Sequence, residues 1–260
     1  MKARRFFPGI VACMVLACTG GPGRTAGSIP ASVSPASTGP QPSAMASNAA
    51  SPEGPINVLD LSDFTPLDAG TTYFVDPDFD VATPLRVVFT VPAPGWSSWS
   101  GTFKDEDPLV GISIVEVTNL TEDACRNPAS ADPPIGPTVA NLARALTKLY
   151  PFEVVEPSTE VTRWGYSGKH LKVRVSDELA VELRDGEPYF TDCLGGHLQT
   201  WKARVLSFAF RGYGPDFTEE YWILDVEGTR LVVASNVGPN ARPETIAERD
   251  QILESLLIEP

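Results

Sequence analysis

The cysteine at position 18 carries the clearest chemistry in this sequence. It ends the tetrad Val-Leu-Ala-Cys at positions 15–18, which follows three basic residues and an apolar run over residues 6–17. This pattern is typical of a bacterial lipobox, in which the cysteine thiol is acylated and becomes the first residue of the mature chain. The apolar run is short for a membrane span, so the pattern predicts a signal peptide over residues 1–17 and a lipid anchor at Cys18.

Two alternatives for this segment stay open. Cys13 also ends a short lipobox-like pattern, but it would leave an apolar region broken by Pro8-Gly9 and only a few residues long. The chain could also be secreted without a lipid, after cleavage near Ala26.

Cys125 and Cys193 are the cysteines that remain after the signal and the anchor are set aside. Outside the cytoplasm two thiols in one domain usually pair, so we expect a disulfide that closes a loop of about 70 residues. A metal site or a redox pair is the alternative, but the sequence has no CxxC spacing and no third ligand nearby.

No set of residues in the chain forms a recognisable catalytic or metal-binding motif. His170 and His197 have no companions in sequence, and both are interpreted as surface histidines. Ser167 lacks the Gly-x-Ser-x-Gly elbow of a hydrolase, and the acidic run over residues 76–80 begins like a calcium loop but lacks its glycine and its bidentate glutamate. We therefore predict no catalytic residue, no metal and no cofactor.

The aromatic residues offer the remaining candidates for a binding site. Trp222 stands within a strand-like run and is expected in the core, and Trp96 is expected to plug the end of a sheet. Trp99 lies among serines in a loop after Pro94-Gly95, and Tyr213 lies in a second loop rich in glycine. These two are the predicted ligand-binding residues, because an exposed aromatic ring can stack on a sugar or a peptide.

Residues 18–55 have the composition of a disordered tether. Ser, Pro, Ala, Gly and Thr dominate this segment, so it cannot bury enough apolar surface to offset its chain entropy. Residues 56–260 then form a single globular domain with 16 basic and 32 acidic residues. This charge argues against nucleic acid and anionic lipid as partners of the domain surface.

Periodicity divides the domain between strands and two main helices. The strongest strand signals cover residues 85–91, 110–117, 160–164 and 169–175, followed by a hairpin of 220–226 and 229–235 that turns at Glu227-Gly228. The helices are expected from Val139 to about Leu149, with Thr138 as N-cap, and from Pro243 to about Leu257. The predicted fold is α+β, with both helices packed on a mainly antiparallel sheet.

Several short segments carry a resemblance to a known family. They include Phe89-Thr-Val-Pro, Gly95-Trp96, Gly165-Tyr-Ser-Gly168 and Tyr221-Trp-Ile-Leu-Asp-Val-Glu-Gly-Thr-Arg230. Together they resemble a family of uncharacterised exported lipoprotein domains of high-GC Gram-positive bacteria, and more loosely the Mog1/PsbP-like α/β/α sandwich. The family has no assigned activity, so the resemblance implies a binding or sensing module.

The sequence thus favours a protein anchored by lipid to the outer face of the cell membrane. Its domain is expected to bind an envelope glycan or a protein partner without catalysis. One alternative is a hydrolase of envelope polymers that uses acidic residues such as Glu219, Glu220 and Asp225, which would require two carboxylates about 5–10 Å apart. The other is a passive structural lipoprotein.

The anchor can be tested by exchanging each candidate cysteine. We expect Cys18→Ser to move the protein from the membrane fraction to the soluble fraction, because the acyl chains supply the membrane affinity. Cys13→Ser is the matched control and should stay in the membrane fraction, as followed by immunoblotting. Retention of the Cys18→Ser variant would rule out Cys18 as the anchor.

Overall fold

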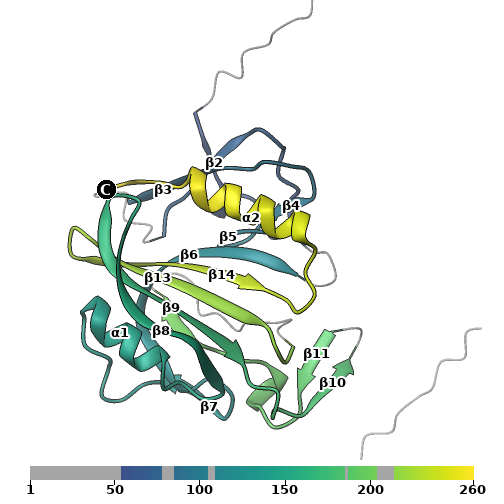
Figure 1. Ribbon diagram of the computed structural model, residues 1–260, viewed down its shortest axis with the longest axis vertical. Helices are drawn as coiled ribbons and strands as arrows, with labels where there is room; N and C mark the ends of the chain where they lie inside the picture. Colours follow the sequence, from purple (N-terminus) through teal and green to yellow (C-terminus); the bar gives the residue numbers. More distant parts are fainter. Residues whose placement is uncertain (1–53, 78–84, 105–108, 185–186, 204–213) are drawn as a thin grey trace, which may run out of the picture. The chain divides into compact units, whose positions relative to one another are not determined.

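The computed structural model describes residues 54–77, 85–104, 109–184, 187–203 and 214–260. The chain from Ser51 to Pro260 forms one compact unit, in which about half of the described residues lie in strands (Figure 1). Cys18, the tether up to residue 53 and Tyr213 lie outside the described residues. None of the described helices is long and apolar enough to cross a membrane.

A large antiparallel sheet forms the centre of the unit. Its strand order is β4 (Trp96–Ser98), β5 (Gly101–Lys104), β6 (Val110–Asp123), β14 (Thr229–Val237), β13 (Thr218–Val226), β9 (Tyr166–Val175) and β8 (Phe152–Arg163). The far half of β6 leaves this order and pairs with β7 (Asn127–Ser130) and β12 (Trp201–Ala203).

Two smaller sheets complete the strands. One has the order β1 (Ile56–Asn57), β2 (Thr72–Val75), β3 (Arg86–Thr90) and β15 (Leu257–Glu259), and the other is a hairpin of β10 (Val181–Arg184) and β11 (Glu187–Phe190). The helices are α1 (Val139–Leu146) and α2 (Pro243–Ser255), with short 3₁₀ turns at Val58–Asp60 and Leu194–Gly196.

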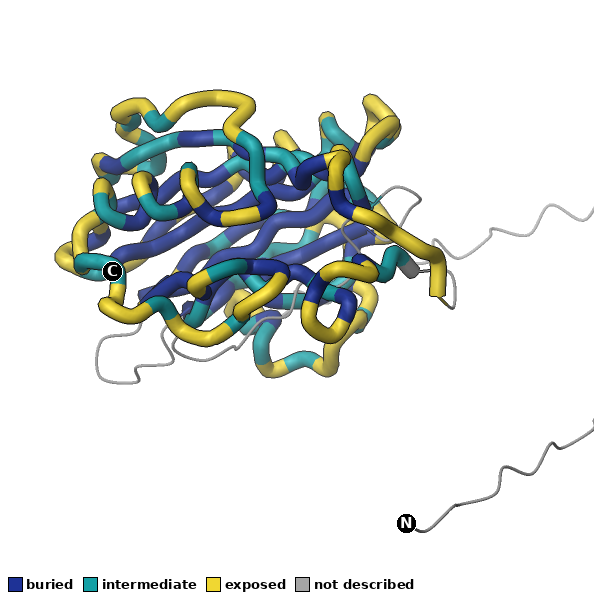
Figure 2. The backbone as a smooth tube through the Cα atoms, turned by 90° about the horizontal axis from the view of Figure 1, so that it is seen from below, coloured by how far each residue is buried: buried dark blue, intermediate teal, exposed yellow. Residues whose placement is uncertain are grey.

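The central strands of the large sheet are covered on both faces. On one face α1 packs Leu142 and Leu146 against strand residues such as Leu171 and Tyr221. On the other face α2 and the four-stranded sheet share a second apolar core with strand residues such as Trp222. Figure 1 shows α2 with β2 and β3 at one end of the view and α1 at the other, and Figure 2 shows the layer of buried strands between exposed segments.

The predicted fold class is wrong. About 50% of the described residues lie in strands and 15% in helices, so the unit is dominated by its sheets and is no α/β/α sandwich of two helices packed on one sheet. The reason is that the face of the large sheet that packs against α2 is covered partly by a second sheet, the four-stranded one. In that sheet β3 pairs with β15, so that Arg86 lies opposite Glu259, and no local pattern in the sequence reveals such a distant pairing.

The predicted hairpin turn and the predicted cap of the first helix are confirmed. The hairpin of β13 and β14 turns at Glu227 and Gly228, which both have positive φ, as a type I′ turn requires. Thr138 caps α1 through a reciprocal capping box with Asn141. The second helix ends at Ser255 because Leu257 continues as the strand β15.

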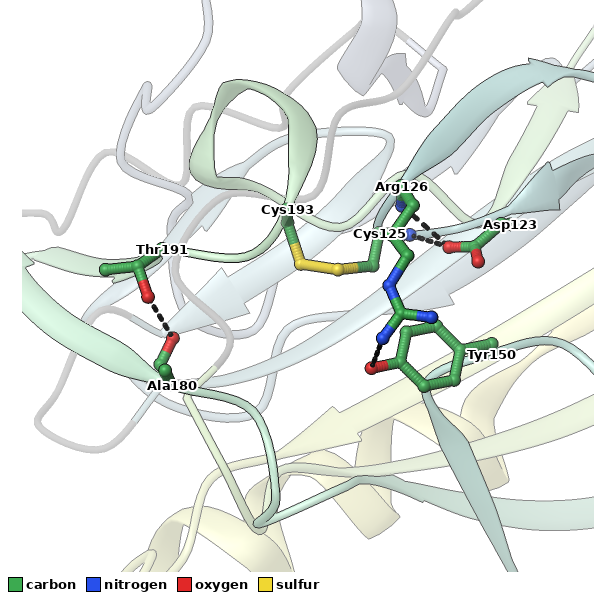
Figure 3. The surroundings of a disulfide bond; sticks show 7 residues. All are labelled: Asp123, Cys125, Arg126, Tyr150, Ala180, Thr191 and Cys193. Carbon is green, nitrogen blue, oxygen red and sulfur yellow. Dashed lines mark hydrogen bonds between the residues drawn. A yellow bond between two sulfur atoms is a disulfide. The ribbon is translucent and has the colours of Figure 1, made fainter.

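The predicted disulfide between Cys125 and Cys193 is present and joins residues 68 positions apart (Figure 3). Both cysteines pack in an apolar cluster with Phe190, Leu198 and Phe217, among others. The disulfide therefore ties the end of β6 to the segment that follows β11.

Removal of this cross-link should destabilise the domain. On the chain-entropy model, closing a loop of 68 residues restricts the unfolded chain by about 4 kcal/mol. We expect the Cys125→Ala/Cys193→Ala double variant to lose up to about this amount, as measured by urea unfolding against the oxidised wild type. A loss below about 1 kcal/mol would mean that the bond contributes little.

Candidate functional site

Three aromatic side chains, Phe64, Trp99 and Phe103, form the aromatic cluster. The ring centroids of Phe64 lie 5.1 Å from Trp99 and 5.5 Å from Phe103, and Trp99 lies 6.2 Å from Phe103. Phe103 is buried and Trp99 is partly exposed, whereas 59% of Phe64 is accessible. The cluster therefore presents aromatic surface to solvent from a buried base.

The edge strand β4 positions this cluster. Trp99 stands in the turn between β4 and β5, and Phe103 lies on β5. The segment that carries Phe64 runs along β4, where the Phe64 amide donates to the Ser98 carbonyl (3.1 Å) and the Ser98 amide donates to the Thr65 carbonyl (2.8 Å). Phe64 is thus fixed to the sheet through its backbone.

Phe64 adopts a backbone conformation that is unusual for a large side chain. Its φ is +65°, in the left-handed region that costs an L-residue roughly 1–2 kcal/mol. The buried hydroxyl of Ser98 holds this turn, because it accepts from the Thr65 amide (3.1 Å) and donates to the Ser62 carbonyl (2.9 Å). An exposed aromatic ring on a strained and well-held backbone is a feature of binding sites.

Trp96 and Trp222 are buried and belong to the core. Trp96 is fully buried, and its indole donates to the Glu248 carboxylate of α2 at 3.0 Å. Trp222 is buried in the core, as predicted. Of the two predicted ligand-binding residues, Trp99 joins the cluster, while Tyr213 lies outside the described residues.

A row of residues that lie opposite one another on neighbouring strands leads from the cluster to the buried Glu219. Phe103 pairs with Gly111, Gly111 with Asn236, and Asn236 with Glu219. Space at Gly111 is tight, because a Cβ atom there would lie 3.2 Å from the Cβ of Phe103 and 3.0 Å from the Oδ1 of Asn236. The amide of Asn236 and the buried base of the cluster are therefore close neighbours.

Glu219 is the most unusual ionisable group in the described part of the chain. Only 2% of the residue is accessible, and neither carboxyl oxygen has a hydrogen-bond partner among the described residues. Burial raises the pKa of Glu219 to about 8, because a charged carboxylate is poorly solvated there. The side chain is consequently neutral at pH 7.

The side chain of Glu220, the next residue, lies on the opposite face of β13. Its carboxylate lies 2.8 Å from Nε2 of His170 and 3.6 Å from Nη1 of Arg249 on α2. His170 also packs against Trp222, with 18% of its side chain accessible, so the prediction of a surface histidine is wrong for this residue. This cluster joins α2 to the large sheet.

The acidic residues considered for a hydrolase do not come together. Glu219 and Glu220 point to opposite faces because they are adjacent in a strand. Asp225 lies at the far end of β13, where it accepts a hydrogen bond from the Gly228 amide at 2.9 Å. Within the described ranges no group of three or more His, Cys, Asp or Glu residues is placed to hold a metal ion.

The structure therefore defines a sheet-rich domain with an aromatic surface cluster at one sheet edge. No protein-family model matches the chain, and no curated protein matches it in sequence. Among solved structures it is similar to the crystal structure of LpqN, involved in cell envelope biogenesis of Mycobacterium tuberculosis, at 16% sequence identity over 78% of this chain and 95% of that one. The TM-score is 0.31, which does not establish a shared fold, so the family resemblance of the sequence stays a prediction.

The raised pKa of Glu219 predicts a pH dependence of stability. Between its ordinary value of 4.5 and about 8, the group is ionised in the unfolded chain but protonated in the folded one. The folded state then binds more protons, so its stability falls as pH rises through this window, by about 1.4 kcal/mol per unit from this group.

Glu219→Gln should flatten this decline, since an amide does not titrate. Urea unfolding at several pH values across the window measures the slope, and Glu182→Gln, at an exposed position, is the matched control. Equal slopes for the wild type and Glu219→Gln would show that Glu219 is ionised in the folded protein.

Proposed function

We propose that this protein is a lipid-anchored extracytoplasmic domain that binds an uncharged glycan of the cell envelope without catalysis. The observation that carries the proposal is the aromatic cluster, in which the exposed ring of Phe64 is fixed beside Trp99. The anchor and the location rest on the lipobox pattern that ends at Cys18 and on the tether that follows it.

The geometry of the cluster suits a sugar ring. The rings of Phe64 and Trp99 lie 5.1 Å apart with their planes inclined by 49°, so they are close enough for one sugar to contact both. The apolar C–H face of a pyranose packs on such rings, while its hydroxyls need polar partners. Ser62 and Thr65 lie close to Phe64 in sequence, and the partly exposed Ser97 lies close to Trp99.

The charge of the domain favours an uncharged ligand. Residues 56–260 carry 16 basic and 32 acidic side chains, and the resulting field repels polyanionic envelope polymers. A neutral polysaccharide does not experience this repulsion.

The absence of catalysis is supported by the positions of the acidic residues. Glycoside hydrolysis uses two carboxylates about 5–10 Å apart on one ligand, whereas Glu219, Glu220 and Asp225 lie on different faces or at different ends of β13. Glu220 is also engaged by His170 and Arg249.

A binding assay with two cluster variants tests this function. We expect the soluble Cys18→Ser protein to bind a purified neutral envelope polysaccharide, and Trp99→Ala to weaken this binding at least tenfold, which corresponds to about 1.4 kcal/mol. Tyr150→Ala, at another exposed aromatic residue, is the control. Calorimetry with neutral and anionic polysaccharide fractions measures the affinities.

Phe64→Gly and Phe64→Ala separate the ring from the strained backbone. Both variants should lose binding, but Phe64→Gly should be more stable than Phe64→Ala, because glycine adopts a positive φ without the steric cost. Binding that survives in both variants and in Trp99→Ala, or that is confined to anionic polymers, would refute the proposed site.

A further inference from the structure

The hairpin of β10 and β11 pairs with no other described strand. Figure 1 shows it at the lower right of the view, away from α2. Val181 pairs with Phe190 and Leu183 with Pro188, so these four residues share one face of the hairpin. We call them the apolar hairpin face.

The apolar hairpin face runs from the core to the solvent. Phe190 is buried in the cluster that surrounds the disulfide. Val181 is 40% accessible, and Leu183 is 76% accessible. Two exposed apolar side chains side by side on one strand of a projecting hairpin are typical of an interaction surface.

The base of the hairpin is firmly held, although an isolated two-stranded hairpin is marginally stable. The Thr191 amide donates to the Ala180 carbonyl at 3.0 Å, and the Cys193 amide donates to the Phe190 carbonyl at 3.1 Å. The disulfide then fixes Cys193 to Cys125 (Figure 3). On the opposite face the Arg184 guanidinium lies 3.3 Å from the centroid of the Tyr189 ring.

Acidic residues flank the hairpin in sequence at both ends. Asp177, Glu178 and Asp192 are all exposed. Glu182, within β10, alternates with Val181 and Leu183, so it lies on the opposite face, where it pairs with Arg184 at 3.4 Å. A partner must therefore accept apolar side chains and complement a negative rim.

We propose that the apolar hairpin face docks a protein partner with an apolar recess rimmed by lysine and arginine. An anionic membrane surface is disfavoured because the acidic rim repels it. A second copy of this chain is disfavoured because its own hairpin would bring the same negative charge. This surface is separate from the aromatic cluster, so the two can be tested independently.

Site-specific photocrosslinking in intact cells tests this inference on the anchored full-length protein. A photoreactive residue replaces Leu183, and the control carries it at Val155, an exposed apolar position on β8. The inference requires a protein adduct specific to position 183, with the crosslinked peptide mapped to a surface rich in lysine or arginine. It is overturned by no protein adduct, by adducts equal at both positions, or by adducts only to lipid or to this chain.

The identified partner is then purified and titrated with the soluble Cys18→Ser protein. Leu183→Glu and the double charge reversal Glu178→Lys/Asp192→Lys should each weaken binding at least tenfold, and higher salt should weaken binding of the partner to the protein without the charge reversal. Val155→Glu should leave the affinity unchanged, and unfolding curves confirm that all variants fold. Unchanged affinity in Leu183→Glu would overturn the inference, whereas Trp99→Ala should leave this affinity intact.

Discussion

Both faces of the central strands of the large sheet are buried, and this constraint decides which residues those strands can carry. A strand with one solvated face alternates apolar and polar residues, whereas a strand with two covered faces must be apolar on both. The runs Tyr221–Leu224 and Leu231–Ala234 meet this demand, since all of their residues are buried. Each face also needs its own cover, which α1 supplies on one side and α2 with the four-stranded sheet supplies on the other.

Polar residues within such a layer need partners, because a buried polar group without a hydrogen bond costs several kcal/mol. Arg230 meets this need structurally. Its guanidinium donates to the carbonyls of Val117 (2.8 Å) and Gly136 (2.7 Å), which fixes the far half of β6 and the approach to α1. Glu220 is satisfied by His170 and Arg249. Glu219 differs from both, since neither of its carboxyl oxygens has a hydrogen-bond partner among the described residues; its raised pKa of about 8 keeps it protonated and so removes the cost of a buried charge.

The sequence predicted the features that depend on neighbouring residues or on compartment. These are the β13–β14 turn, the cap of α1 and the disulfide, each with a local or chemical signature. The four-stranded sheet escaped prediction because β3 and β15 pair across most of the domain. Of the aromatic cluster, the sequence predicted Trp99 but not Phe64. Trp99 stood out in a loop of serines, but Phe64 reaches it only through a positive φ and hydrogen bonds to β4, neither of which has a sequence pattern.

The same constraint explains where the two proposed surfaces lie. Because both faces of the central strands are occupied, a ligand can be met only at sheet edges, turns and projections. The aromatic cluster lies at the β4 edge, and the apolar hairpin face projects beside the disulfide. In each case an exposed apolar side chain extends from a buried base, Phe64 above Phe103 and Leu183 beyond Phe190. A rigid base lowers the entropy lost on binding, so the same buried layer that keeps ligands from the sheet faces gives both proposed surfaces a rigid base.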